Sequence, residues 1–219
     1  MSEATQDTVK CPNCETESTA LIYESINSIL NYEQVERMFD GTLFAHECPN
    51  CHSTIELTYP CLYNDMEHHV MVQYIIDEKK LNEAIDLIDK MAREENAGHE
   101  EDLEVTTRIV TSHNQLREKA LIFKEGLSDM AIEALKAVMM NRFIDEGQIS
   151  GDAECFFGGM TEVGDIVLAF VVDGRTAETV VPRSLYDRVF NMVAGSRMAR
   201  EKTYVVDPGW AALFFQRNA

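Results

Sequence analysis

The chain lacks the features that would place it in a membrane or in an export pathway. Its longest purely apolar run, Ile166 to Val172, is far too short to cross a bilayer, which takes about 20 apolar residues. Residues 1–10 are polar and lack the apolar stretch of a secretory signal. The sequence therefore predicts a cytoplasmic protein with no membrane partner.

Basic residues are scarce as well. The chain carries 19 lysines and arginines against 38 acidic residues, for a formal net charge of −19. The imbalance is large in residues 1–65, which hold 2 basic and 11 acidic side chains, whereas residues 175–219 hold 7 basic and 4 acidic ones. Because binding to phosphates requires clusters of Lys and Arg, the sequence predicts no nucleic-acid partner. The basic C-terminal segment instead favours contact with an acidic protein surface.

Cysteine is rare, at six residues, yet four of the six stand in two copies of one motif. These knuckles are Cys11-Pro12-Asn13-Cys14 and Cys48-Pro49-Asn50-Cys51. Two C-x2-C pairs can bring four thiolates around one tetrahedral ion, and zinc is the usual ion for four cysteines because it accepts soft ligands without redox chemistry. The sequence predicts a structural Zn²⁺ bound by Cys11, Cys14, Cys48 and Cys51.

Other uses of the four cysteines are weaker alternatives. Disulfides would require an oxidising compartment, and a thioredoxin-like redox pair needs only one C-x2-C. Iron and a thiol switch remain open. A site closed by four thiolates leaves no coordination position for a substrate, so the motif predicts a scaffold and not a catalyst.

The 33 residues between the two pairs exceed the roughly 15–20 of common zinc sites. They contain structure of their own, because Asn31 and Gly41 bracket a predicted short helix. Strands are predicted over residues 19–25, 42–46, 53–60 and 69–76. We expect these strands to form a small antiparallel sheet around the knuckles.

The rest of the chain predicts helices followed by a β-hairpin. Helices are expected from Asp77, from Ser112 and from Ser128, and the two glycines within residues 145–152 mark a domain boundary. Asp173-Gly174 between two β-rich runs predicts a hairpin with a type I′ turn. The predicted fold is α+β: a zinc-ribbon-like antiparallel sheet with an inserted helix and packed helices over residues 8–147, and a small α+β domain over residues 151–219.

Three stretches together carry a resemblance to a known family. They are the doubled C-P-x-C, the segment Leu57 to Met66 (L-T-Y-P-C-L-Y-N-D-M) and the segment Arg108 to Lys136 (R-I-V-T-S-H-N-Q-L-R-E-K-A-L-I-F-K-E-G-L-S-D-M-A-I-E-A-L-K). The chain resembles the CpXC domain family of bacteria and archaea over about residues 8–140. The resemblance implies that the four cysteines are metal ligands. It implies no catalytic residue, because the family's function is unknown.

Other candidate site residues have a structural interpretation beside the functional one. Asp65, His68 and His69 could form a second, open metal site, although no third ligand is evident and neighbouring residues of a strand point to opposite faces. Cys61 and Cys155 are expected to be buried hydrophobes, and His52 to occupy a left-handed turn. Four aromatic residues could anchor a protein partner or fill the C-terminal core, namely Phe190, Trp210, Phe214 and Phe215.

Three functions are compatible with the sequence. The favoured one is a non-catalytic structural-zinc protein that acts through a protein partner. The second is a zinc-dependent enzyme that uses a second site near Asp65 and His68. The third is a thiol–zinc redox sensor, in which oxidation of the cysteines releases the metal.

Overall fold

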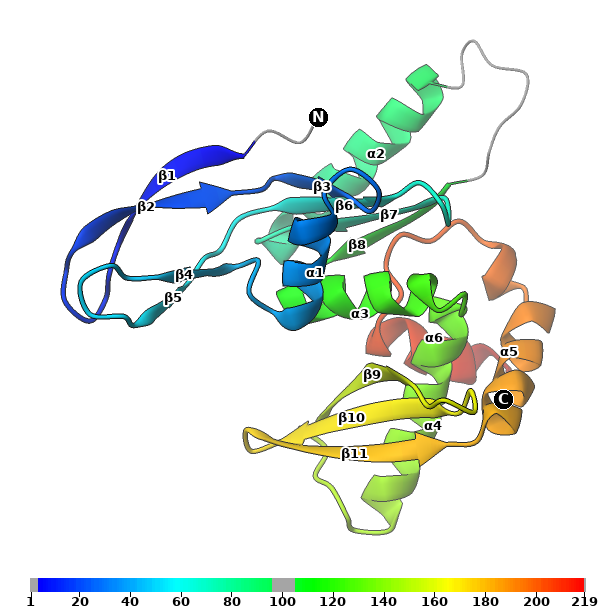
Figure 1. Ribbon diagram of the computed structural model, residues 1–219. Coiled ribbons are helices and arrows are strands. Elements are labelled where there is room, and N and C mark those ends of the chain that lie inside the picture. The colour runs from blue at the N-terminus through cyan, green and yellow to red at the C-terminus, as the bar shows by residue number, and fades with distance from the viewer. Residues whose placement is uncertain (1–3, 96–104, 219) are drawn as a thin grey trace. The chain divides into compact units, whose positions relative to one another are not determined.

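The computed structural model describes residues 4–95 and 105–218 and shows an α+β chain (Figure 1). The chain divides into two compact units, and the boundary in the sequence falls between Arg117 and Glu118. Unit 1 contains β1 (Thr5–Lys10), β2 (Glu17–Ile22), β3 (Ser25–Asn27), α1 (Tyr32–Asp40), β4 (Ala45–Glu47), β5 (Thr54–Glu56), β6 (Cys61–Asp65), β7 (Val70–Tyr74), η1 (Glu78–Lys80), α2 (Leu81–Glu95) and β8 (Thr106–Val110). The boundary falls inside α3 (His113–Lys124). Unit 2 continues with α4 (Asp129–Asp145), β9 (Glu154–Met160), β10 (Ile166–Val172), β11 (Arg175–Val181), α5 (Arg183–Gly195), η3 (Met198–Arg200) and α6 (Pro208–Asn218).

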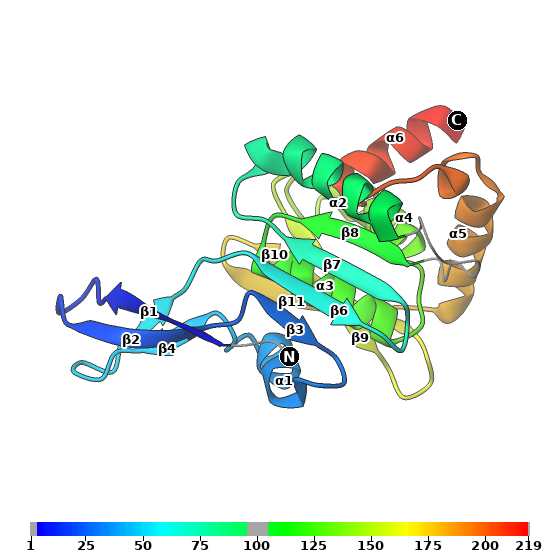
Figure 2. The same cartoon turned by 90° about the horizontal axis from the view of Figure 1, so that it is seen from above.

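Unit 1 is built from two β-hairpins and a separate four-stranded sheet. The hairpins are β1–β2 and β4–β5, both antiparallel, and they are drawn beside each other in Figures 1 and 2. The sheet has the order β3-β6-β7-β8. Within it β6 and β7 are antiparallel, whereas β3 runs parallel to β6 and β8 parallel to β7.

The predicted single antiparallel sheet around the knuckles is therefore wrong in its connectivity. The strands divide between the hairpins and a mixed sheet, because the inserted residues supply a parallel edge strand, β3, and not a continuation of the hairpins. The inserted helix is confirmed as α1, and it ends at Gly41 in the left-handed conformation (φ 83°). The Asn31 side chain does not cap this helix. Its Oδ1 accepts the backbone N–H of Asn27 at 2.9 Å.

The first residue of α3 is held in an aromatic cluster. The His113 ring stacks on Phe44, with ring centroids 3.8 Å apart, and meets the edge of Tyr74 at 4.8 Å. Its Nδ1 lies 3.6 Å from Oε1 of Glu56, at the end of β5. Because Phe44 precedes β4 and Glu56 is the last residue of β5, this cluster links the second hairpin to the beginning of α3.

Unit 2 packs helices against a three-stranded antiparallel sheet. The sheet has the order β11-β10-β9, and Asp173 and Gly174 both have positive φ in the β10–β11 turn, as the sequence predicts. Ile166, Leu168 and Phe170 of β10 are buried in a core shared with α4, α5 and α6. α4 supplies an unbroken run of buried side chains over residues 131–136.

The boundary between the units differs from the one expected at residues 145–152. It lies about 30 residues earlier, and the glycine-containing segment before β9 is a connection inside unit 2. The physical reason is the shared core, since Ile132 and Leu135 of α4 belong to the same buried cluster as β10 and α6. The first half of α4 is buried on all sides, and such a segment cannot be separated from the elements that cover it.

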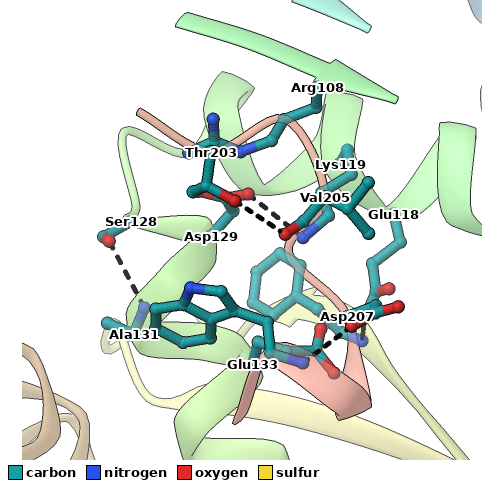
Figure 3. A network of polar contacts seen from close by, with 12 residues as sticks. Arg108, Glu118, Lys119, Ser128, Asp129, Ala131, Glu133, Thr203, Val205 and Asp207 are labelled. Atoms are coloured by element: carbon teal, nitrogen blue, oxygen red, sulfur yellow. Dashed lines mark hydrogen bonds and ion pairs between the residues drawn. The ribbon is translucent and has the colours of Figure 1, made fainter. Parts of the chain in front are cut away.

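A cluster of buried charges joins α3, α4 and β9 within unit 2. The Lys136 ammonium donates to Glu118 and Glu133 at 2.9 Å each, and Lys119 donates to Asp129 at 3.1 Å (Figure 3 shows Lys119 and Asp129). All five side chains are at least 93% buried. Glu118 also accepts the backbone N–H of Phe157, the β9 residue, at 2.6 Å.

The charges in this cluster depend on one another. Burial lowers the pKa of Lys136, but Glu118 and Glu133 act in the opposite direction and hold it above its ordinary value. Burial raises the pKa of Glu133 despite the neighbouring ammonium groups. Lys136 therefore stays charged and compensates two carboxylates that have no access to water.

Replacing Lys136 should destabilise unit 2 severely. A Lys136→Met variant keeps the volume but leaves Glu118 and Glu133 buried without the ammonium group that they bind, which typically costs about 3–5 kcal/mol. The matched control is Arg142→Met on the same helix, where an exposed pair with Glu146 contributes only about 0–1 kcal/mol. Urea unfolding monitored by Trp210 fluorescence measures both. Equal losses in the two variants would contradict the assigned role of Lys136.

The His113 cluster should make unit 1 less stable below neutral pH. Burial lowers the pKa of His113 against the opposing effect of Glu56, and Nε2 is buried without a hydrogen-bond partner. Because the unfolded state then takes up a proton first, the stabilisation is complete above pH 6.5 and is lost as the pH falls through the lower pKa of the folded state. The expected loss between pH 7.5 and 5.5 is on the order of 1 kcal/mol.

His113→Phe tests this dependence because it retains the stacking and cannot titrate. The urea midpoints of the metal-loaded wild type and of the variant are compared at the two pH values. The variant should lose less stability than the wild type on acidification. The same loss in both proteins would show that other groups determine the acid sensitivity.

Candidate metal centre

The two knuckles occupy the turns of the two hairpins of unit 1. Cys11 and Cys14 lie between β1 and β2, and Cys48 and Cys51 lie between β4 and β5. Proline in second position fixes the backbone direction after the first cysteine. Each knuckle is followed by a residue in the left-handed conformation, Glu15 (φ 59°) and His52 (φ 57°), which turns the chain into the second strand. The predicted left-handed position of His52 is thereby confirmed.

All four sulfurs converge on one point. Cys11 Sγ lies 3.6 Å from Cys51 Sγ, and Cys14 Sγ lies 3.5 Å from Cys48 Sγ. The four sulfur atoms are all within 4.8 Å of one another. Four thiolates at about 2.3 Å from a zinc ion would be about 3.8 Å apart. The spacing therefore fits a tetrahedral ion, and the four cysteines can hold a metal.

The knuckles repeat each other in their backbone hydrogen bonds as well as in sequence. The amide of Cys11 donates to the carbonyl of Thr16 and the amide of Cys48 to that of Ser53, both at 2.9 Å. The amides of the two left-handed residues donate back to the carbonyls of Cys11 and Cys48 at 2.9 and 3.0 Å. Each turn is thus fixed by two backbone bonds before any metal is considered. The second knuckle reproduces the first with an offset of 37 residues.

Hydroxyl groups support the second cysteine of each knuckle. The Thr16 hydroxyl lies 3.3 Å from Cys14 Sγ, and the Ser53 hydroxyl lies 3.2 Å from Cys51 Sγ. Side-chain and backbone hydrogen bonds from Ser53 lower the pKa of Cys51 to about 5, and those from Thr16 lower the pKa of Cys14. These donors stabilise the thiolate form, which is the form that binds metals.

The first cysteine of the first knuckle has a different environment. The amide of Cys14 lowers the pKa of Cys11, but burial and the adjacent thiols of Cys51 and Cys48 raise it, to about 11 overall. Cys11 and Cys48 are fully buried, whereas Cys14 and Cys51 are partly exposed. A divalent cation would offset the crowding of thiolates in this space.

Hydrogen bonds between the two hairpins help to hold the knuckles next to each other. The Asn13 amide donates to the Ser53 hydroxyl at 3.1 Å, and the Ser18 hydroxyl pairs with His46 Nε2 at 2.8 Å. His52 is not a metal ligand in this geometry. Its Nδ1 lies 2.6 Å from Glu47, and this contact raises the pKa of the imidazole.

Asp65, His68 and His69 do not form a second metal centre among the described residues. There, the four cysteines are the one group of three or more potential ligands that come together. Asp65 is buried and accepts bonds from Ser28, Tyr63 and His68, together with the amides of Glu67 and His68. Burial raises the pKa of Asp65, but the bonds from His68 and Tyr63 bring it below the ordinary value. The carboxylate therefore stabilises the β6–β7 turn.

The remaining candidates divide between core and surface. Cys61 is buried and Cys155 partly buried, and burial raises the pKa of each thiol to about 12, so both are unreactive. In unit 2, Trp210 and Phe214 lie in the core, Phe215 is partly buried, and Phe190 is 41% exposed. The proposed set of four aromatic anchors is therefore reduced mainly to Phe190.

A hollow of about 470 Å³ in unit 1 lies beside the His113 cluster. It is lined mainly by hydroxyl-bearing and aromatic side chains with Glu56 and Arg117, and it does not include Asp65 or His68. The sequence interpretation missed this hollow, because its lining comes from four separate segments. It also missed Thr16 and Ser53, although a hydroxyl two residues after each knuckle was a readable signal.

The described residues contain no helix with the length and apolar character of a membrane span. Neither the curated proteins nor the solved structures yielded a match. The model of one family, described as CpXC protein, matches residues 9–136, which is more than half of the chain and includes both knuckles. The four converging cysteines are thus accompanied by a match that continues through α3 into α4, and the chain belongs to the CpXC family.

Proposed function

We propose that this protein is a non-catalytic zinc scaffold in which Cys11, Cys14, Cys48 and Cys51 bind one structural Zn²⁺. The observation that carries the proposal is the convergence of four sulfurs at tetrahedral spacing. Zinc suits this donor set better than harder cations because thiolates are soft ligands. Four protein ligands would complete the coordination shell, so the metal would support the structure and would not meet a substrate.

The scaffold acts in the cytoplasm through a protein partner, in this proposal. The thiols favour a reducing compartment, since none of the six cysteines forms a disulfide. The strongly acidic composition of residues 1–65 opposes contact with nucleic acid and favours a basic protein surface. An enzyme centred on Asp65 is disfavoured, because that carboxylate is buried and already accepts five hydrogen bonds.

A thiol–zinc redox sensor is the second candidate. It is favoured by the partial exposure of Cys14 and Cys51, which lie on the outer side of the centre. Oxidation of these two sulfurs would remove ligands from the metal. A sensor releases zinc under low peroxide and rebinds it after reduction, whereas a purely structural centre retains zinc until the protein unfolds.

Metal analysis of the purified protein should find one zinc per chain, and Cys48→Ser should reduce the content strongly. Structural zinc contributes about 10–16 kcal/mol in small zinc peptides, so removal should unfold the hairpins of unit 1. Unit 2 supplies no ligand and should persist. Hydrogen exchange with and without a chelator separates the units. A stoichiometry near zero, or simultaneous exposure of both units with one midpoint, would contradict the proposal.

The full chain should show no measurable affinity for nonspecific DNA or RNA at physiological salt. Fluorescence anisotropy with labelled duplex DNA and single-stranded RNA provides the measurement. Arg188→Glu serves as the control variant, because it removes an exposed charge from the basic segment. Tight binding by the wild type that weakens steeply with salt and is lost in the variant would show that residues 175–219 dominate over the net charge.

A further inference from the structure

Four large apolar side chains are exposed at one end of the four-stranded sheet of unit 1. They are Ile29 (62% exposed), Leu30 (68%), Tyr32 (71%) and Met66 (56%), and we name them the apolar tip. Ile29 and Leu30 lie in the loop between β3 and α1, and Tyr32 is the first residue of α1. Met66 lies in the turn between β6 and β7. Single exposed apolar residues are ordinary, but exposed apolar residues gathered on two neighbouring segments are typical of an interaction site.

The topology of the sheet brings the two segments together. β3 and β6 are parallel neighbours, with Asn27 opposite Asn64, so the segments that follow these two strands leave the sheet at the same end (Figure 2). The amide of Ser28 donates to the carbonyl of Asn64 at 2.9 Å, and the Ser28 hydroxyl donates to Asp65 at 3.1 Å. Ile29 and Met66 each directly follow one of these bonded residues.

Hydrogen bonds hold the β3–α1 loop in one conformation. Asn27 Oδ1 accepts the amides of Ile29 and Leu30 at 2.9 and 3.1 Å. The amide of Asn31 donates to the carbonyl of Asn27 at 3.0 Å, and Asn31 Oδ1 accepts the amide of Asn27. The side chains of Ile29 and Leu30 are thus exposed to solvent on a loop that is held by several hydrogen bonds. A surface that is ordered before binding loses less entropy when a partner arrives.

The surroundings of the tip are acidic. Glu33, Glu36 and Glu67 are exposed and lie within four residues of a member of the tip, and residues 23–36 and 61–74 contain no lysine or arginine. A second copy of the tip would bring like charges together, and an anionic lipid surface would be repelled for the same reason. The complementary surface is one that combines apolar side chains with lysine and arginine.

We propose that the apolar tip binds a basic amphipathic segment of another protein, with the apolar face of that segment on Leu30 and Met66 and its cations beside Glu33 and Glu67. This inference deepens the proposed function and rests on it, since it identifies the surface through which the zinc scaffold meets its partner. Apolar contact supplies the affinity, and the glutamates next to the tip favour a positively charged partner over a negatively charged one.

The test uses the zinc-loaded full chain and a fluorescein-labelled helical peptide of about five turns, with leucine on one face and lysine on the other. Two matched peptides replace leucine by serine or lysine by glutamate. Fluorescence anisotropy should show binding to the Lys/Leu peptide, and at least about tenfold weaker binding to both controls. Binding that needs lysine but not leucine would overturn the proposal.

Two variants of the tip and one control locate the binding surface. Leu30→Ser and Met66→Ser should each weaken binding of the Lys/Leu peptide by about tenfold. Leu87→Ser should have no effect, although Leu87 is 58% exposed on α2 and lies next to Asp86. Glu33→Gln with Glu67→Gln should weaken binding and reduce its salt dependence. An equal effect of Leu87→Ser, or none of Leu30→Ser, would overturn the proposal.

Two further readouts separate the alternatives. Binding of the full chain to phosphatidylcholine vesicles that is lost in Leu30→Ser would identify a lipid as the occupant and overturn the protein assignment. Zinc content and circular dichroism are measured on every sample. Normal zinc with unchanged peptide binding in the tip variants defeats the tip proposal alone. Absence of zinc from the wild type defeats the proposed function, whatever the peptide result.

Discussion

The convergence of the four cysteine sulfurs is the constraint on which the rest of unit 1 depends. Both knuckles lie at hairpin turns, so their meeting fixes the relative position of β1–β2 and β4–β5. A metal ion bound by all four cysteines would also close the intervening segment into a loop and prevent its ends from separating. The conformational entropy of a closed loop of this length is much lower than that of an open chain. α1 and the short strand β3 therefore form within a boundary that the cysteines set.

The two units are stabilised in different ways. Unit 1 has short strands and small hairpins, and metal coordination can replace the apolar area that such elements do not bury. Unit 2 has a continuous apolar core, with the Lys136 and Lys119 ion pairs embedded in it. A buried ionic cluster adds little net stability compared with apolar packing, but it tolerates few alternative arrangements. We infer that it fixes the register of α3, α4 and β9.

Local signals in the sequence predicted local structure well. The knuckles, the Asp173-Gly174 turn and the Gly41 helix end each depend on a few adjacent residues whose backbone preferences leave little choice. The grouping of the four cysteines also followed from spacing alone. The pairing of β3 with β6 did not, because parallel neighbours far apart in the chain leave no mark at either strand.

The expected domain boundary differs from the division into units for a related reason. The glycines near residue 147 indicate a break in the backbone, but they do not tell which elements share a core. α4 contained the informative signal, since apolar residues recur on every face of this helix and its charged residues Glu133 and Lys136 are buried as well. The first half of this helix has no exposed face and therefore needs partners on all sides, and these partners come from both directions along the chain.

The limits of the family and the limits of the folded units do not coincide, and this has a practical consequence. The family match ends at residue 136, within α4 and about two turns after that helix begins. A protein fragment that ends at this position would keep Glu118 but lose Phe157, whose backbone amide donates to the Glu118 carboxylate. It would also leave Ile132 and Leu135 without the β10 side chains that share their buried cluster. Such a fragment would expose the apolar side chains of a truncated α4 and would be prone to aggregate during expression. Because the boundary between the units falls inside α3, the whole chain is the form that keeps both units intact.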